Sequence, residues 1–172
     1  EKTPQLQRIN ISRTSGRNVD NLHEGGDFIF YHPPGIDTPE KEQINNWSKK
    51  KLILWKPKVK NVLPYIQKSK ISILPSYREG LPKSLLEAAS CGLPLISTNV
   101  PGCREICMDN FNGILVKSKD HRSLSRAIKR LIKNPSLIRK FGKNGRKLVE
   151  KNFSSKIISQ KFLKLYQKFL LE

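Results

Sequence analysis

The chain has 172 residues, of which 37% are apolar, and this composition suits one globular domain with a buried core rather than a disordered chain. No apolar run approaches the roughly 20 residues of a membrane span, and the first residues, EKTPQLQRIN, lack the apolar core of a signal peptide. The 33 Lys and Arg residues against 14 Asp and Glu give a formal net charge of +19, which fits either an anionic partner or solvated lysine-rich faces.

The first 26 residues are polar and show no sustained period of 2 or 3.6 residues, so we expect an irregular N-terminal segment over 1–26 and a folded domain over 27–172. In that domain, Phe28 to Tyr31 is predicted to be a short buried strand, because two prolines and a glycine follow it closely. Thr38 is a suitable N-cap for a helix that extends to about Lys49, and the apolar run Leu52 to Trp55 predicts another strand.

The middle of the chain alternates between predicted helices and strands. We expect a helix over Val62 to Ser69, a strand over Ile71 to Pro75, a helix that ends near Gly92, and strands over Leu93 to Thr98 and Gly113 to Val116. Strands with continuous apolar runs are typical of parallel sheets, which are buried on both faces. The predicted fold class is therefore α/β, with a Rossmann-like parallel sheet flanked by helices and a helical C-terminal segment.

From Ser118 onward the sequence predicts helices only. Asp120 can cap the first of them, Pro135 begins the next, and Ser154 or Ser155 caps the last. The last helix carries one apolar stripe, which fits either packing on the core or contact with a membrane surface. The stripe consists of Ile157, Ile158, Phe162, Leu165, Tyr166 and Phe169.

The cysteines predict no metal centre and no disulfide framework. Cys91, Cys103 and Cys107 cannot all pair with one another, and they form neither a CxxC motif nor a cluster with histidine. We expect reduced thiols and no bound metal.

The loop SYREGLP, which joins a predicted strand to a predicted helix, is the strongest candidate for a binding site. Such a junction presents backbone N–H groups and the positive end of a helix dipole to an anion, and Gly80 allows the backbone to approach it closely. The carboxylates of Glu79 and Glu87 are suited to accepting hydrogen bonds from sugar hydroxyls on either side of a diphosphate. Spacing alone leaves another interpretation open, in which Glu79 caps a turn and Glu87 pairs with Lys83.

The run ISILPSYREGLPKSLLEAASCGLPLISTNVPGCREI, followed by NGILV, resembles the C-terminal donor-binding domain of the family 4 glycosyltransferases, which have the GT-B fold and an E-x7-E motif. The resemblance extends from about Ile36 to Glu172, and Glu79 and Glu87 occupy the two acidic positions of the motif. It implies a transferase of surface polysaccharide synthesis that moves a glycosyl group from a nucleotide sugar to a saccharide or lipid-linked acceptor with retention of configuration.

The resemblance also implies a role for each residue of the loop. Glu79 would be the catalytic residue that contacts the transferred sugar, and Glu87 would bind the ribose hydroxyls of the nucleotide. Gly80, Leu81 and Pro82 would lie beside the diphosphate, with N–H donors from the first two only, since proline has none. No metal or other cofactor is implied, because the nucleotide sugar is itself a substrate.

Two features of the family are missing from this sequence. Nothing in it matches the N-terminal domain that binds the acceptor, and Arg13 and Arg17 do not form the basic pair that neutralises the donor diphosphate. We therefore expect the isolated chain to be inactive, and an alternative is a catalytically inactive remnant that acts as a basic anion-binding or membrane-binding module. We expect a cytoplasmic protein, in peripheral contact with anionic lipid at the inner membrane surface if the acceptor is lipid-linked, and no nucleic-acid partner.

Overall fold

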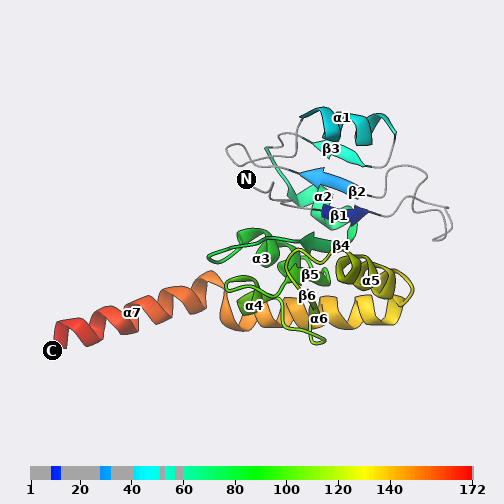
Figure 1. Cartoon of the computed structure of the whole chain (residues 1–172). Helices are drawn as coiled ribbons and strands as arrows, with labels where there is room; N and C mark the ends of the chain where they lie inside the picture. Colours follow the sequence, from blue (N-terminus) through cyan, green and yellow to red (C-terminus); the bar gives the residue numbers. More distant parts are fainter. Residues whose placement is uncertain (1–8, 13–27, 32–40, 51–52, 57–59, 172) are drawn as a thin grey trace.

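The computed structural model describes residues 9–12, 28–31, 41–50, 53–56 and 60–171. These residues form one mixed sheet with helices around it (Figure 1). The strands are β1 (Ile9–Ser12), β2 (Phe28–Tyr31), β3 (Leu54–Lys56), β4 (Ser69–Leu74), β5 (Leu95–Thr98) and β6 (Gly113–Val116). The helices are α1 (Lys41–Lys49), α2 (Leu63–Lys68), α3 (Lys83–Ser90), α4 (Cys103–Ile106), α5 (His121–Ile132), α6 (Pro135–Asn152) and α7 (Ser155–Leu171).

The sheet has the strand order β3-β2-β1-β4-β5-β6. Strands β4, β5 and β6 are parallel to one another, as the sequence predicts, and helices connect them. This half of the sheet confirms the α/β fold class. Strand β1 departs from the prediction, because it runs antiparallel to both of its neighbours, β2 and β4.

Strand β1 also lies inside the segment 1–26, for which the sequence predicts no regular structure. It has only four residues, INIS, which is too short a run to stand out in a polar segment. The other residues of 1–26 lie outside the described residues, as does Thr38, which was expected to cap the helix now seen as α1.

Alternate residues of the parallel strands face two separate apolar clusters. Ile73, Ile96 and Ile114 are aligned across β4, β5 and β6, and they pack with buried residues of α5 and α6 on one face. Leu74 and Leu95 belong to the cluster on the other face, which includes buried residues of α3 and α4. The core is thus divided by the sheet, in agreement with the predicted helices on both faces.

The structure confirms the predicted starts of α5 and α6. One carboxylate oxygen of Asp120 accepts hydrogen bonds from the N–H groups of Arg122 and Ser123, at 3.0 and 2.9 Å, so Asp120 caps α5. Pro135 is the first residue of α6, and the side chain of Asn134 accepts from Leu137 N–H. Figure 1 shows α6 running past the β6 end of the sheet, and the helix contributes side chains to both clusters.

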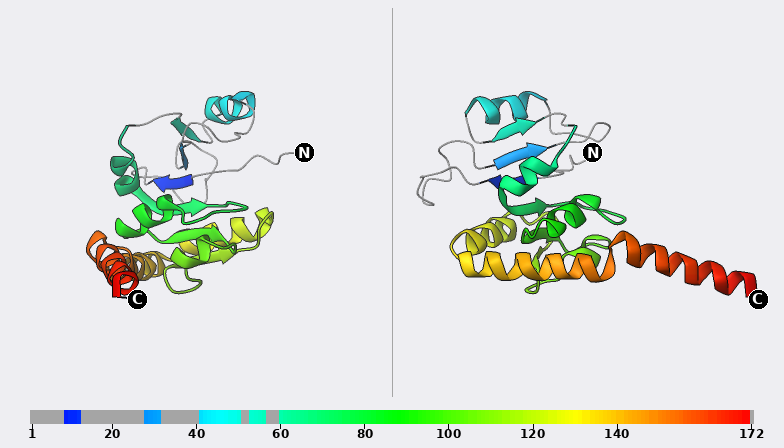
Figure 2. Two further views of the ribbon diagram at one scale, coloured as in Figure 1. Left: turned by 90° about the vertical axis from the view of Figure 1, so that its left-hand side faces the viewer. Right: turned by 180° about the vertical axis from the view of Figure 1, so that it is seen from behind.

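Helix α7 extends away from the rest of the chain, as the reversed view in Figure 2 shows most clearly. Ile157 and Ile158, near its start, are half-buried, whereas Phe162, Tyr166 and Phe169 are 55%, 62% and 69% exposed. The prediction that the apolar stripe packs on the core is therefore wrong for its C-terminal part, from Phe162 to Phe169, as far as the described residues show. None of the described helices is long and apolar enough to cross a membrane.

Candidate donor-binding site

The loop between β4 and α3 lies at the carboxyl end of β4, beside the carboxyl end of the parallel strand β5. In open α/β sheets this edge is where ligands bind. The loop ends at Pro82, which occupies the N-cap position of α3 with φ −69°. Among the described residues, no side chain caps α3, so none of them satisfies the N–H groups at the start of this helix. Both features suit an anionic ligand.

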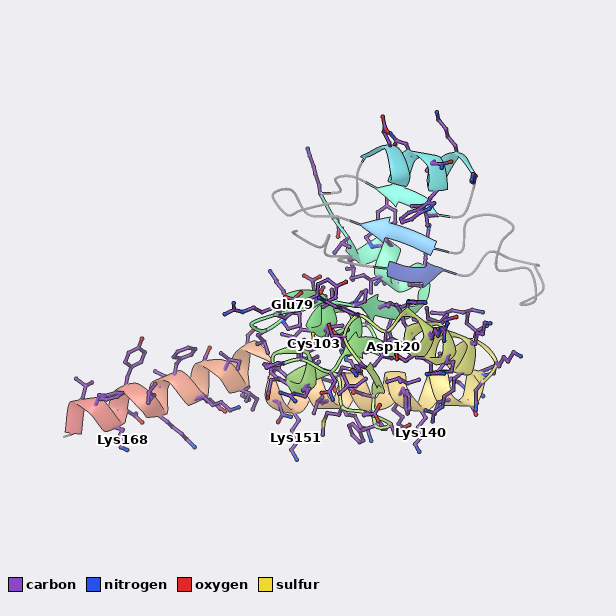
Figure 3. All side chains as sticks on the ribbon, viewed as in Figure 1. Glu79, Cys103, Asp120, Lys140, Lys151 and Lys168 are labelled. Carbon is purple, nitrogen blue, oxygen red and sulfur yellow. The ribbon has the colours of Figure 1, made fainter. Side chains whose placement is uncertain are left out.

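Glu79 is half-buried, and its carboxylate is held within the loop. The hydroxyl of Ser76 donates a hydrogen bond to Glu79 Oε1 at 2.6 Å, a short distance that is typical of a bond between a hydroxyl and an ionised carboxylate. This contact agrees in part with the simpler interpretation from spacing, in which Glu79 makes a local turn contact. Figure 3 labels Glu79 on the loop beside α3.

The other predicted donor-binding residues lie on the same loop or on the helix that follows it. Gly80 and Leu81 are exposed, with Leu81 52% exposed, and Pro82 is buried at the start of α3. Glu87 is half-buried on α3, one turn beyond the exposed Lys83 at the start of the helix. Leu85 and Ala88 of the same helix lie in the core. The structure thus joins all five predicted residues through one loop and one short helix.

The turn before α4 supports this loop through its backbone. Gly102 has φ +80°, and a side-chain Cβ at this position would overlap with the carbonyl oxygens of Gly80 and Glu79. Only glycine permits both the positive φ and such a close approach of two backbones. Gly102 therefore packs the turn that follows β5 directly against the loop that carries Glu79.

Two further contacts hold the first half of the loop. The hydroxyl of Thr98, at the end of β5, donates a hydrogen bond to the backbone carbonyl of Ser76. The ammonium group of Lys119, which follows β6, lies 5.7 Å from the centre of the Tyr77 ring, within the range of a cation–π interaction. Segments that follow β4, β5 and β6 thus meet at one edge of the sheet.

Cys103 lies behind the loop and is fully buried. Burial raises the pKa of its thiol, and the nearby Glu79 carboxylate adds to the rise, while hydrogen bonds from Ser97 and Thr98 oppose it. Burial likewise raises the pKa of the Cys107 thiol far above its usual range. No disulfide joins Cys91, Cys103 and Cys107 in the structure.

Sequence reasoning assigned no role to Ser76, Thr98, Gly102 or Lys119, although Ser76 is the first residue of the candidate loop SYREGLP. Ser76, Thr98 and Gly102 lie within the motif run of residues 71–106, but nothing in their spacing predicts which atoms they contact. Arg13 and Arg17 lie outside the described residues. In the described part of the chain, no group of three or more His, Cys, Asp or Glu residues is arranged to hold a metal ion.

Comparison with known proteins identifies the fold as that of a glycosyltransferase domain. Residues 35–148 match the profile of the family described as "Glycosyl transferases group 1", and the chain belongs to that family. It is 32% identical over 114 residues to the capsular polysaccharide biosynthesis glycosyltransferase CapM of Staphylococcus aureus, a match that covers 66% of this chain and 30% of CapM.

Two other similar proteins extend the comparison. The chain is 32% identical over 110 residues to an N,N'-diacetylbacillosaminyl-diphospho-undecaprenol alpha-1,3-N-acetylgalactosaminyltransferase of Campylobacter jejuni, covering 64% of this chain and 29% of that enzyme. The solved structure of the pneumococcal O-GlcNAc transferase GtfA in complex with UDP and GlcNAc superimposes with a TM-score of 0.70 and 25% identity, over 84% of this chain and 29% of GtfA. The chain spans about 30% of the length of the curated relatives that it matches.

Proposed function

We propose that this chain binds a nucleotide sugar as the donor of a glycosyl transfer, with Glu79 against the transferred sugar and Glu87 against the ribose. The observation that carries the proposal is the carboxylate of Glu79, which is held by Ser76 on a loop that ends at the N-terminus of α3. The diphosphate would accept hydrogen bonds from the N–H groups of Gly80 and Leu81, and each carboxylate would accept from sugar hydroxyls. The donor complex needs no metal ion in this arrangement.

The acceptor and the stereochemistry belong to the proposal as well. Relatives in capsular polysaccharide synthesis and a relative named for an undecaprenol diphosphate substrate favour a saccharide or lipid-linked acceptor. Family resemblance favours retention of the anomeric configuration. Because the chain spans about 30% of these relatives, we propose that it holds the donor and does not by itself complete the transfer. Glycosylation of a lipid-linked acceptor by the purified 172-residue chain would contradict this part of the proposal.

Thermal unfolding with and without nucleotides tests the donor site. A ligand that binds only the folded state raises the midpoint of unfolding, and the free-energy gain is about 2.7 kcal/mol at a ligand concentration of 100 times Kd. We expect UDP or GDP at millimolar concentration to raise the midpoint, and Glu87→Ala to reduce the rise. Lys140→Ala, on the far side of α6, is a matched exposed control that should leave the rise unchanged. No rise with any nucleoside diphosphate would contradict the proposal.

The net charge of +19 favours a second candidate, a catalytically inactive module that binds anionic surfaces. The exposed stripe of α7 and the lysines on the same helix would suit the surface of an anionic membrane, which also fits a lipid-linked acceptor. Sedimentation with phosphatidylglycerol vesicles at low and high salt tests this contact. We expect binding that weakens with salt; no binding at low salt would exclude a peripheral membrane role, and binding without any nucleotide effect would favour the inactive module.

A further inference from the structure

The side chain of Ser76 contacts the carboxylate of Glu79 and can fix its orientation. Ser76 is fully buried just after β4, and its hydroxyl donates to Oε1 of Glu79, three residues further along the loop, at 2.6 Å. Within the part of the chain that the structure describes, no other hydrogen bond reaches this carboxylate. One oxygen of Glu79 is therefore engaged by the protein, and the other retains its capacity to accept from a ligand.

The backbone of Ser76 is itself anchored to the next strand. The buried hydroxyl of Thr98 donates to the carbonyl of Ser76, and Thr98 is the last residue of β5. Its β5 neighbour Ser97 donates to the carbonyl of Leu74 at 2.8 Å, which fixes the end of β4 just before the loop. The position of the Ser76 hydroxyl is thus set by the sheet rather than by the exposed half of the loop.

We propose that Ser76 is a positioning residue for the donor sugar, which acts by holding the Glu79 carboxylate in one orientation. This inference rests on the proposed function, in which Glu79 contacts the transferred sugar. A glutamate on an exposed loop samples several rotamers, and fixing one of them on binding reduces affinity. The hydrogen bond from Ser76 fixes the rotamer before the ligand binds, and so removes that entropic cost. Because Glu79 contacts only the transferred sugar, the gain in affinity is confined to ligands that carry the sugar.

The test compares the affinity for a nucleoside diphosphate with that for its sugar nucleotide, measured by calorimetry on the full chain. The probes are UDP and UDP-glucose, or GDP and GDP-mannose if the thermal screen shows a preference for guanosine. We expect Ser76→Ala to weaken binding of the sugar nucleotide about tenfold and to change binding of the diphosphate less than about twofold. Ser69→Ala is the matched control, because it removes a buried hydroxyl that bonds the backbone carbonyl of Tyr65 at the other end of β4 and does not bond Glu79.

Three outcomes would overturn the proposal. They are an equal loss of affinity for both ligands in Ser76→Ala, no loss of affinity for the sugar nucleotide in Ser76→Ala, and the same selective loss in Ser69→Ala. If the wild-type chain binds neither ligand, the proposed function fails while the positioning role is still measurable. Side-chain couplings of Glu79 in NMR spectra of the unliganded chain should then show one dominant rotamer in the wild type and averaging in Ser76→Ala, and averaging in both would reject the positioning role itself.

Discussion

Gly102 lies directly against the carbonyl oxygen of Gly80, so the turn after β5 serves as a support for the loop that carries Glu79. Gly102→Ala introduces a Cβ that overlaps with that oxygen and imposes a positive φ on alanine. We expect the variant to lose binding of sugar nucleotide in calorimetry, because the loop must move. Gly92→Ala is the control: Gly92 also has a positive φ, +75°, but a Cβ there meets its nearest atom only at 4.0 Å. Equal effects of the two variants on binding would show that φ strain, and not displacement of the loop, is responsible.

Two glycines of α6 should respond differently to alanine. A Cβ on Gly142 would overlap with the carbonyl oxygen of Gly92, at the end of α3, whereas a Cβ on Gly145 would make an ordinary contact with Ala89 at 3.5 Å. We expect Gly142→Ala to lower the free energy of unfolding by about 1–3 kcal/mol. Gly145→Ala should leave it unchanged or raise it slightly, since alanine favours a helix. Urea denaturation measures both, and a stable Gly142→Ala chain would show that α3 and α6 do not approach as closely as described.

The cap of α5 predicts a dependence of stability on pH. Hydrogen bonds from the Ser123 and Arg122 N–H groups lower the pKa of Asp120. A depressed pKa in the folded state contributes stability at pH values above the unfolded pKa of about 4, and this contribution is lost as the pH falls through the lower folded value. Asp120→Ala should therefore lower the thermal midpoint at pH 7, and its difference from the wild type should shrink as the pH falls below the unfolded pKa of about 4. A constant difference over that range would mean that the carboxylate charge plays no part in the cap.

The three thiols should differ in reactivity. Cys91 is half-buried, whereas Cys103 and Cys107 are fully buried with thiol pKa values raised mainly by that burial. The thiolate is the reactive form, so a raised pKa and lost access both slow alkylation. At pH 8 we expect iodoacetamide to modify Cys91 in the native chain and all three cysteines only in urea, as mass spectrometry would show. Rapid native modification of Cys103 would indicate that the loop in front of it opens.

Local signals in the sequence predicted the elements whose boundaries depend on local contacts. Asp120 and Pro135 mark the starts of α5 and α6 because a cap and a first-turn proline act within a few residues. The apolar runs of β4, β5 and β6 likewise follow from burial on both faces. The sequence could not predict whether the apolar stripe of α7 is buried or exposed. A period of 3.6 residues is the same for a helix that packs on a core and for one that extends from it.

The sequence names candidate residues for the site, but not the contacts that support their loop. Glu79 and Glu87 were identified from the motif, and the short separation between Ser76 and Glu79 permits their contact. The contact is fixed, however, by Thr98 and Gly102, which come more than 20 residues later and reach the loop only because β4 and β5 are adjacent. Such contacts depend on tertiary structure and leave no periodic signal in the sequence.

The most direct test of the account is calorimetric titration of the chain with a nucleoside diphosphate and with its sugar nucleotide, for Glu79→Gln and Glu87→Gln. If Glu87 binds the ribose, Glu87→Gln should lower the affinity for both ligands by about tenfold or more. If Glu79 binds the transferred sugar, Glu79→Gln should lower the affinity for the sugar nucleotide alone by about tenfold or more. Unchanged binding of both ligands in both variants would contradict the assignment of the two carboxylates to the donor.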